Sequence, residues 1–311
     1  MPPQFQVVVH PRIPSLSDPL RFLQAYQRGD ANASNALIFL GGLTSGPHTT
    51  DLDLLSHTLE QHSELGCSLW ELRTRSAYTG FGHSSLANDA EDIGDLVRYI
   101  RASPHTTAGK IVLMGASTGS QACLQYAKTT ARPDGVDVDA YILTSPVSDR
   151  EFAALIMAPE TLVESLRLAR KMIANGNEQD IMPRALMPFV LADVPVSAYR
   201  WHSLASEGGD DDFFSSDLSD AQLATTFGQV DKPLLILAAG EDEMVPPTVD
   251  RQALMRRWIA ACRPGVCSRL SGFIPGAGHE VEDIHARQWL AARVALFLGE
   301  GVSGLGADSE L

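Results

Sequence analysis

The stretch that decides the fold is IVLMGASTGSQACLQYA, residues 111–127. An apolar run typical of a buried strand enters G-A-S-T-G, residues 115–119, and a helical pattern follows. This context predicts a nucleophile elbow, a turn so tight that side chains at the two glycine positions would collide with neighbouring backbone. Such a turn places the Ser117 hydroxyl at the start of a helix, where backbone N–H groups favour a developing negative charge. The alternative is an ordinary glycine-rich connection between a strand and a helix.

Around this stretch, short apolar segments alternate with amphipathic ones, which predicts an α/β fold with a mostly parallel sheet covered by helices on both faces. The expected strands are 4–10, 20–26, 36–40, 68–72, 110–114, 140–144, 233–239 and 268–274. The expected helices are 51–65, 86–102, 117–128, 248–261 and 283–298. Together with the elbow, this pattern predicts an eight-stranded α/β-hydrolase fold.

One region, between the expected strands 140–144 and 233–239, breaks the alternation. So long a connection needs helices of its own, and these are expected near 150–175 and 183–191. The expected organisation is a first core part at 1–146, a helical cap at 147–228, a second core part at 229–300 and a flexible tail at 301–311. The acidic stretch EGGDDDFFSSDLSD, residues 207–220, is expected to be a solvated loop, and a cation site is the less favoured alternative.

A serine hydroxyl becomes a good nucleophile only with a base, and the base needs an acid that orients it. In this fold they follow in the order serine, acid, histidine. Glu241, Asp242 and Glu243 come directly after the apolar run PLLILAAG, and Asp242 is favoured because the Val-Pro that follows resembles the acid loop of many α/β-hydrolases. The alternative is a charged turn in which Glu243 caps the next helix.

The predicted base is His279, in RLSGFIPGAGHEVED. Among the nine histidines it alone combines a position after a strand, a flanking glycine and a place downstream of the acid. An ordinary loop histidine is the alternative. The expected oxyanion hole takes one backbone N–H from Thr118 and one from Leu43, with Gly42 adjacent, although the glycines there could simply form a turn.

The bulk composition is that of an ordinary globular protein. The chain has 311 residues, of which 44% are hydrophobic and 20% charged. A formal net charge of -14 without a basic run argues against nucleic acid or an anionic membrane as a partner. No secretion signal or apolar run of roughly 20 residues is recognised, so a soluble cytoplasmic protein is expected. The four cysteines are interpreted as reduced thiols, and no metal or other cofactor is expected.

Several motifs resemble a fungal and plant family of α/β-hydrolases that includes intracellular esterases of fusarinine-type siderophores. They are LIFLGGL (37–43), SAYTGFGHSSLANDAEDIGDLVRYIR (76–101), MGASTGSQ (114–121), GEDEMVP (240–246) and GAGHE (276–280). The resemblance implies hydrolysis of an ester joining hydroxamate units, which releases iron inside the cell. It also implies that Ser117, Asp242 and His279 form the triad. One position departs from the family pattern, because Ala116 replaces the histidine of the usual G-H-S-T-G.

The same resemblance suggests substrate contacts. Tyr78, Phe81 and Gly82 fall on a loop expected to face the elbow, where Tyr78 either hydrogen-bonds a substrate carbonyl or simply packs. In the insertion, the run Tyr199–His202 contains Trp201, which is expected to form a pocket wall or, alternatively, a buried helix face.

The leading hypothesis is therefore a serine hydrolase that cleaves a small-molecule carboxylic ester through an acyl-enzyme. Lactone, thioester or amide cleavage and acyl transfer use the same machinery and stay open. A hypothesis of a different class is a non-catalytic protein that keeps the fold and binds a small ligand. A metal-dependent hydrolase is disfavoured because the sequence lacks H-E-x-x-H.

Overall fold

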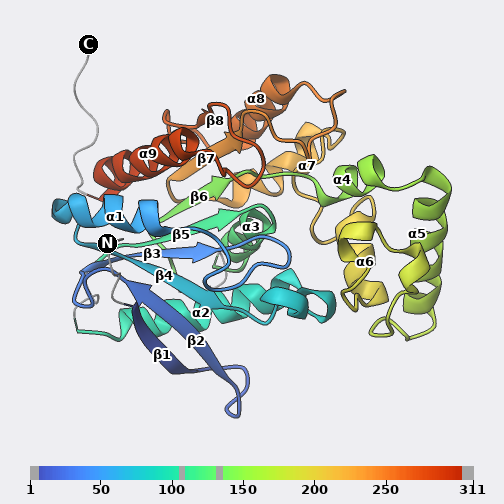
Figure 1. Ribbon diagram of the computed structural model, residues 1–311, viewed down its shortest axis with the longest axis horizontal. Helices are drawn as coiled ribbons and strands as arrows, with labels where there is room; N and C mark the ends of the chain where they lie inside the picture. The colour runs from blue at the N-terminus through green and yellow to red at the C-terminus, as the bar shows by residue number, and fades with distance from the viewer. Residues whose placement is uncertain (1–6, 105–108, 131–135, 303–311) are drawn as a thin grey trace.

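A twisted eight-stranded sheet forms the centre of the molecule (Figure 1). The computed structural model describes residues 7–104, 109–130 and 136–302. The strands lie in the order β1-β2-β4-β3-β5-β6-β7-β8, in which β2 is antiparallel to both β1 and β4 and the other neighbours are parallel. The predicted mostly parallel sheet is confirmed.

The elements follow the predicted alternation. The strands are β1 Val7–Pro14, β2 Phe22–Arg28, β3 Asn35–Leu40, β4 Cys67–Arg73, β5 Ile111–Ala116, β6 Ala140–Thr144, β7 Leu234–Ala239 and β8 Gly272–Ile274. The α-helices are α1 Asp53–Gln61, α2 Leu86–Arg101, α3 Thr118–Thr130, α4 Asp149–Ile156, α5 Pro159–Ala174, α6 Ala198–Ala205, α7 Asp220–Ala224, α8 Arg251–Ala261 and α9 Ile284–Val302. Short 3-10 turns are η1 Ser63–Leu65, η2 Tyr78–His83, η3 Arg184–Leu186, η4 Phe189–Leu191 and η5 Phe227–Gln229.

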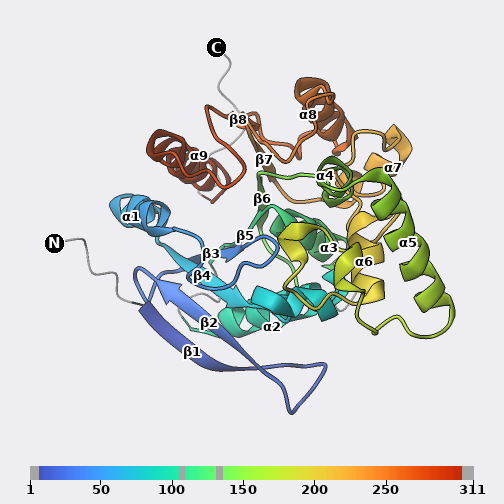
Figure 2. The same cartoon turned by 45° about the vertical axis from the view of Figure 1, so that its right-hand side comes forward.

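Helices cover both faces of the sheet, which explains why the central strands are apolar throughout rather than alternating. Helices α1 and α9 lie side by side over one face, and α2, α3 and α8 pack on the other (Figures 1 and 2). Strands β6 and β7 are buried at every position. Among the described residues, no helix is both long and apolar enough to span a bilayer.

Some element ends differ from the prediction. Strand β8 begins at Gly272 rather than at 268, because Ser271 N–H donates to the Ser268 carbonyl and closes a turn there. Helix α8 begins at Arg251 because the Asp250 carboxylate accepts the Ala253 N–H as its N-cap. Residues 4–6 of the first expected strand and 303–311 of the expected tail lie outside the described residues.

The segment between β6 and β7 is helical, as expected for its length, and α4, α5 and α6 pack around a cluster of their own (Figure 2). The single helix expected at 150–175 is two helices, because Pro159 starts α5 at its first turn. The helix expected at 183–191 is replaced by η3 and η4, which follow Pro183 and Pro188. Helices α4, α5 and α6 lie beyond the carboxyl ends of strands β3 and β5 (Figure 1).

The expectation of a solvated acidic loop at 207–220 is wrong. Asp211 is buried, and its carboxylate accepts hydrogen bonds from Arg200 at 2.5 Å and Ser203 at 2.6 Å. Asp212 forms an ion pair with Arg150 at 3.2 Å. The two phenylalanines that follow are buried in the core below α3 and α8. Arg150 of α4 pairs with Asp212, and Arg200 of α6 pairs with Asp211. These ion pairs offset the cost of burying the two carboxylates.

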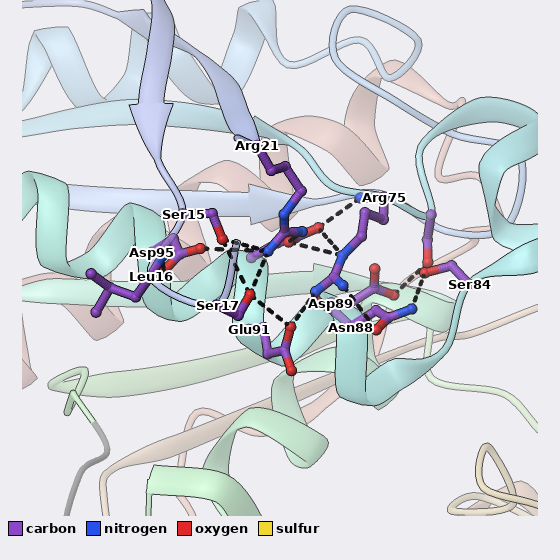
Figure 3. Close-up of polar contacts among 12 residues, drawn as sticks. Ser15, Leu16, Ser17, Arg21, Arg75, Ser84, Asn88, Asp89, Glu91 and Asp95 are labelled. Atoms are coloured by element: carbon purple, nitrogen blue, oxygen red, sulfur yellow. Dashed lines mark hydrogen bonds and ion pairs between the residues drawn. The ribbon is translucent and has the colours of Figure 1, made fainter. Parts of the chain in front are cut away.

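A second buried charge network ties the β1–β2 hairpin to α2. Arg21 comes from the loop before β2 and Arg75 from the loop after β4, and both guanidinium groups contact the fully buried Asp92 of α2. Figure 3 shows the two arginines converging on the carboxylates of this helix. The network fixes the loop that leads into η2.

The Arg200–Asp211 pair gives a stability prediction. We expect Asp211→Asn to lower the free energy of unfolding by about 3 kcal/mol or more, because the buried guanidinium loses its charged partner. The matched control is Asp210→Asn, a change at the exposed neighbouring carboxylate, which should cost less than about 1 kcal/mol. Urea unfolding of both variants measures the difference, and equal losses would contradict the prediction.

Candidate active site

Ser117 lies in a strained turn between β5 and α3. Its φ of 53° is in the left-handed region, which a residue with a side chain seldom adopts. A Cβ on Gly115 would lie 2.1 Å from the Gly119 carbonyl oxygen, and one on Gly119 would lie 2.3 Å from the Leu40 carbonyl oxygen. Both positions therefore require glycine. The turn is held by a hydrogen bond from the Ser117 N–H to the Thr144 carbonyl at 3.0 Å.

The structure brings together the three residues predicted as a triad. His279 Nε2 lies 2.9 Å from Ser117 Oγ, and His279 Nδ1 lies 2.9 and 3.1 Å from the two carboxylate oxygens of Asp242. Asp242 and His279 are buried. Since a carboxylate only accepts hydrogen bonds, Nδ1 carries the proton and Nε2 is left to accept one from the serine hydroxyl. The arrangement can remove the Ser117 proton.

Asp242 also sets the basicity of the imidazole. Burial by itself lowers the pKa of His279, but the hydrogen bond and negative charge of Asp242 outweigh burial, so the pKa lies above that of an ordinary histidine. Nearby Glu280 and Glu243 act in the same direction.

Two further side chains hold the loops that carry the acid and the histidine. The Glu243 carboxylate accepts the His279 N–H at 2.9 Å, and Arg251 of α8 donates to the carbonyls of Gly240 at 3.0 Å and Asp242 at 2.6 Å. Glu243 therefore positions the histidine loop, and Asp250 caps α8 in its place. Sequence reasoning missed this role because the pairing of two distant loops leaves no local pattern.

The two predicted oxyanion donors lie beside the elbow. In the described chain, neither the Leu43 N–H nor the Thr118 N–H has a hydrogen-bond acceptor, so both are free to bind an anion. Gly42 approaches Ser117 closely, since a Cβ there would lie 2.8 Å from Ser117 Cβ. A larger residue at this position would displace Ser117.

A cavity of about 280 Å³ opens over Ser117 and His279. Its lining is largely apolar, and part of it comes from the segment between β6 and β7, with Ile156, Leu191, Trp201 and Leu204. Of the predicted substrate contacts, Gly42 and Trp201 line the cavity. Trp201 is buried in α6, where its Nε1 donates to Ser165 Oγ at 2.9 Å. Ala116, which stands where the G-H-S-T-G pattern has a histidine, also lines the cavity.

The other two predicted substrate contacts, Tyr78 and Phe81, lie outside this lining. The Tyr78 hydroxyl donates to the Pro47 carbonyl at 2.9 Å, and its ring packs against Gly46. Phe81 is buried with the helices of the insertion and lines a separate small cavity of about 50 Å³. Both rings are held by these contacts and support the loop that contains η2.

Sequence reasoning missed four ionisable residues of the cavity lining, which are Asp51, Asp149, Glu280 and Arg287. Asp149, the first residue of α4, lines the cavity that contains Ser117 and His279. In sequence it reads only as an acid in the first turn of a helix, a common position for one. Its place in the cavity beside Ser117 depends on how the chain leaves β6.

Comparison with known proteins shows the family to which the chain belongs. Residues 13–299 match the family described as "Protein of unknown function (DUF1749)". The chain is 36% identical to the UPF0613 protein PB24D3.06c of Schizosaccharomyces pombe, over 82% of this chain and 84% of that protein. It is 32% identical to the fusarinine C esterase sidJ of Aspergillus fumigatus, over 85% of this chain and 88% of that protein.

A solved structure agrees with the sequence relatives. Siderophore hydrolase EstB from Aspergillus fumigatus superposes with a TM-score of 0.74 and 31% identity, covering 89% of this chain and 94% of that one. The predicted α/β-hydrolase fold and family resemblance are thereby confirmed. The chain belongs to the DUF1749 family of α/β-hydrolases, which includes these fungal siderophore esterases.

Proposed function

We propose that the protein is a serine hydrolase that cleaves a carboxylic ester through an acyl-enzyme intermediate. Ser117 is the nucleophile, His279 the general base and Asp242 the residue that orients it. The observation that carries the proposal is the 2.9 Å contact between Ser117 Oγ and His279 Nε2, with Asp242 on the other ring nitrogen.

In the first half of the proposed reaction, Ser117 Oγ attacks the ester carbonyl carbon while His279 Nε2 takes the hydroxyl proton. The carbonyl oxygen becomes an anion, which the N–H groups of Leu43 and Thr118 stabilise. The tetrahedral intermediate then collapses, the bond to the alcohol oxygen breaks, and His279 returns the proton to the departing alcohol. Asp242 remains negatively charged and stabilises the imidazolium.

In the second half, water replaces the alcohol. His279 takes a proton from the water as its oxygen attacks the acyl carbon, and the same two N–H groups stabilise the second oxyanion. Cleavage of the bond to Ser117 Oγ releases the carboxylic acid and restores the hydroxyl. No group other than these side chains and backbone donors is needed.

The substrate class follows from the family and the cavity. Two relatives with named activities are an esterase of fusarinine C and a siderophore hydrolase, so an ester that joins hydroxamate units is the proposed substrate. The largely apolar cavity of about 280 Å³ suits the apolar part of such a molecule. Lactones, thioesters, amides and acyl acceptors fit the same chemistry, and the relatives favour esters over them.

The nucleophile can be tested with a fluorophosphonate probe and with fusarinine C as substrate. We expect Ser117→Ala to abolish labelling and to reduce turnover by on the order of 10⁴-fold or more. The control is Ser145→Ala, which alters a second cavity serine that also has a positive φ. It should keep the label, and a label that depends on Ser145 would overturn the assignment. An unlabelled wild type would favour the ligand-binding alternative.

The role of Asp242 gives a pH prediction. The base acts in its neutral form, so kcat/KM should rise with pH through the His279 pKa, at a midpoint above that of an ordinary histidine. Asp242→Asn removes the group that raises this pKa, so the midpoint should move to lower pH and the maximal rate should fall by roughly 10⁴-fold. Glu241→Gln, at the exposed neighbouring acid, should leave both unchanged. An unshifted midpoint in Asp242→Asn would contradict the assignment.

A further inference from the structure

Asp149 is a carboxylate in the substrate cavity that the proposed reaction does not use. It follows β6 and the helix-capping Ser148, and it is partly exposed to the cavity that contains Ser117. Its Oδ2 accepts a hydrogen bond from Gln121 Nε2 at 2.7 Å. Gln121 is fully buried in α3, and its amide also faces the Val147 carbonyl at 3.5 Å, which fixes the NH2 group toward Asp149. The carboxylate is therefore held in place.

Asp149 lacks a counter-ion. In the part of the chain that the structure describes, no cationic side chain forms an ion pair with it. Arg200, one of two groups whose positive charge acts on Asp149, is engaged by Asp211 at 2.5 Å. The carboxylate thus has one hydrogen-bond donor and no balancing positive charge.

The surroundings of Asp149 disfavour its ionised form. Burial raises the pKa of Asp149 to about 8, and the negative charge of Asp211 adds to the effect. Arg200, His279 and the Gln121 hydrogen bond oppose the rise without cancelling it. A positive group placed beside the carboxylate would stabilise the ionised form.

His279, which is positively charged when protonated, is paired with Asp242 at 2.9 Å in this cavity. Arg287 lines it but is paired with Asp51, and Glu280 is an exposed acid at its border. The remaining lining is largely apolar. A cation would therefore find its strongest partner at Asp149.

We propose that Asp149 recognises an ammonium group on the ester substrate, in either the acyl or the alcohol half. This inference rests on the proposed esterase function and adds a specificity-determining contact to it. When the substrate binds, the carboxyl group loses its proton to bulk water and pairs with the ammonium. Gln121 keeps the carboxylate oriented, and the apolar lining contacts the rest of the substrate.

The test compares esters that differ only in an ammonium or a methyl group at the same position. The acyl pair is 4-nitrophenyl 6-aminohexanoate and 4-nitrophenyl heptanoate, and the alcohol pair is the butanoate esters of 3-aminopropan-1-ol and butan-1-ol. For at least one pair, Asp149→Asn should lower the ratio of kcat/KM between the ammonium and methyl esters by about tenfold or more, the value of one charge-assisted hydrogen bond. Asparagine keeps the shape and removes the charge.

Matched controls separate recognition from a structural role. Glu280→Gln removes the other unpaired acid of the cavity and should change both members of a pair by the same factor. An unchanged ratio for both pairs in Asp149→Asn, or equal losses in the two members, would overturn the inference. Fluorophosphonate labelling of Asp149→Asn shows that the variant is folded. If the wild type hydrolyses no ester and takes no label, the proposed function fails instead.

The pH dependence of the same ratio is a second readout. Asp149 ionises as pH rises through about 8, whereas an alkylammonium stays charged there, so the wild-type ratio should increase across this range. Titration of His279 affects both esters and cancels in the ratio. In Asp149→Asn the ratio should be flat, and a flat ratio in the wild type would contradict the inference.

Discussion

The left-handed turn at Ser117 is the constraint on which the site depends. A non-glycine residue with φ near 53° costs of order 1–3 kcal/mol, and the turn persists because the strands on both sides hold it. Strand β3 brings the Leu40 carbonyl against Gly119, and β6 supplies the Thr144 carbonyl to the Ser117 N–H. The same close packing brings Gly42 to Ser117, so the serine and the loop that carries Leu43 are positioned by one set of backbone contacts.

The acid and the histidine reach this turn through the topology of the sheet. Strands β5, β6, β7 and β8 are parallel neighbours, so the loops after β5, β7 and β8 emerge at one end. Topology alone does not fix an imidazole to a fraction of an ångström. Arg251 ties the acid loop to α8, and Glu243 ties the histidine loop to the acid loop. The cluster of acids after β7 thus divides its work between orienting the ring and anchoring its backbone.

The residues that were visible in the sequence are those whose roles have local signatures. Short patterns mark the glycines at 115 and 119, the apolar strands and the order serine, acid, histidine. From these patterns the fold and the three candidate triad residues could be predicted. Contacts between distant segments left no such pattern. Asp211 reads as one of three solvated acids, yet Arg200 makes it a buried one. The sequence suggests Tyr78 as a substrate contact, but in the structure its hydroxyl donates a hydrogen bond to the Pro47 carbonyl.

The segment between β6 and β7 joins stability to specificity. Arg200 of α6 and Asp211 neutralise one another in the interior, which fixes α6 and, with it, Trp201 in the cavity wall. Asp149 comes from the same segment, and the charges of Arg200 and Asp211 act on it as well. Among the described residues, no cationic side chain forms an ion pair with Asp149. A carboxylate that lacks a counter-ion in a largely apolar cavity destabilises a fold, so we explain its position beside Ser117 by a partner that arrives with the substrate. On the proposed function, the core would carry out the reaction and the helices between β6 and β7 would select the molecule that undergoes it.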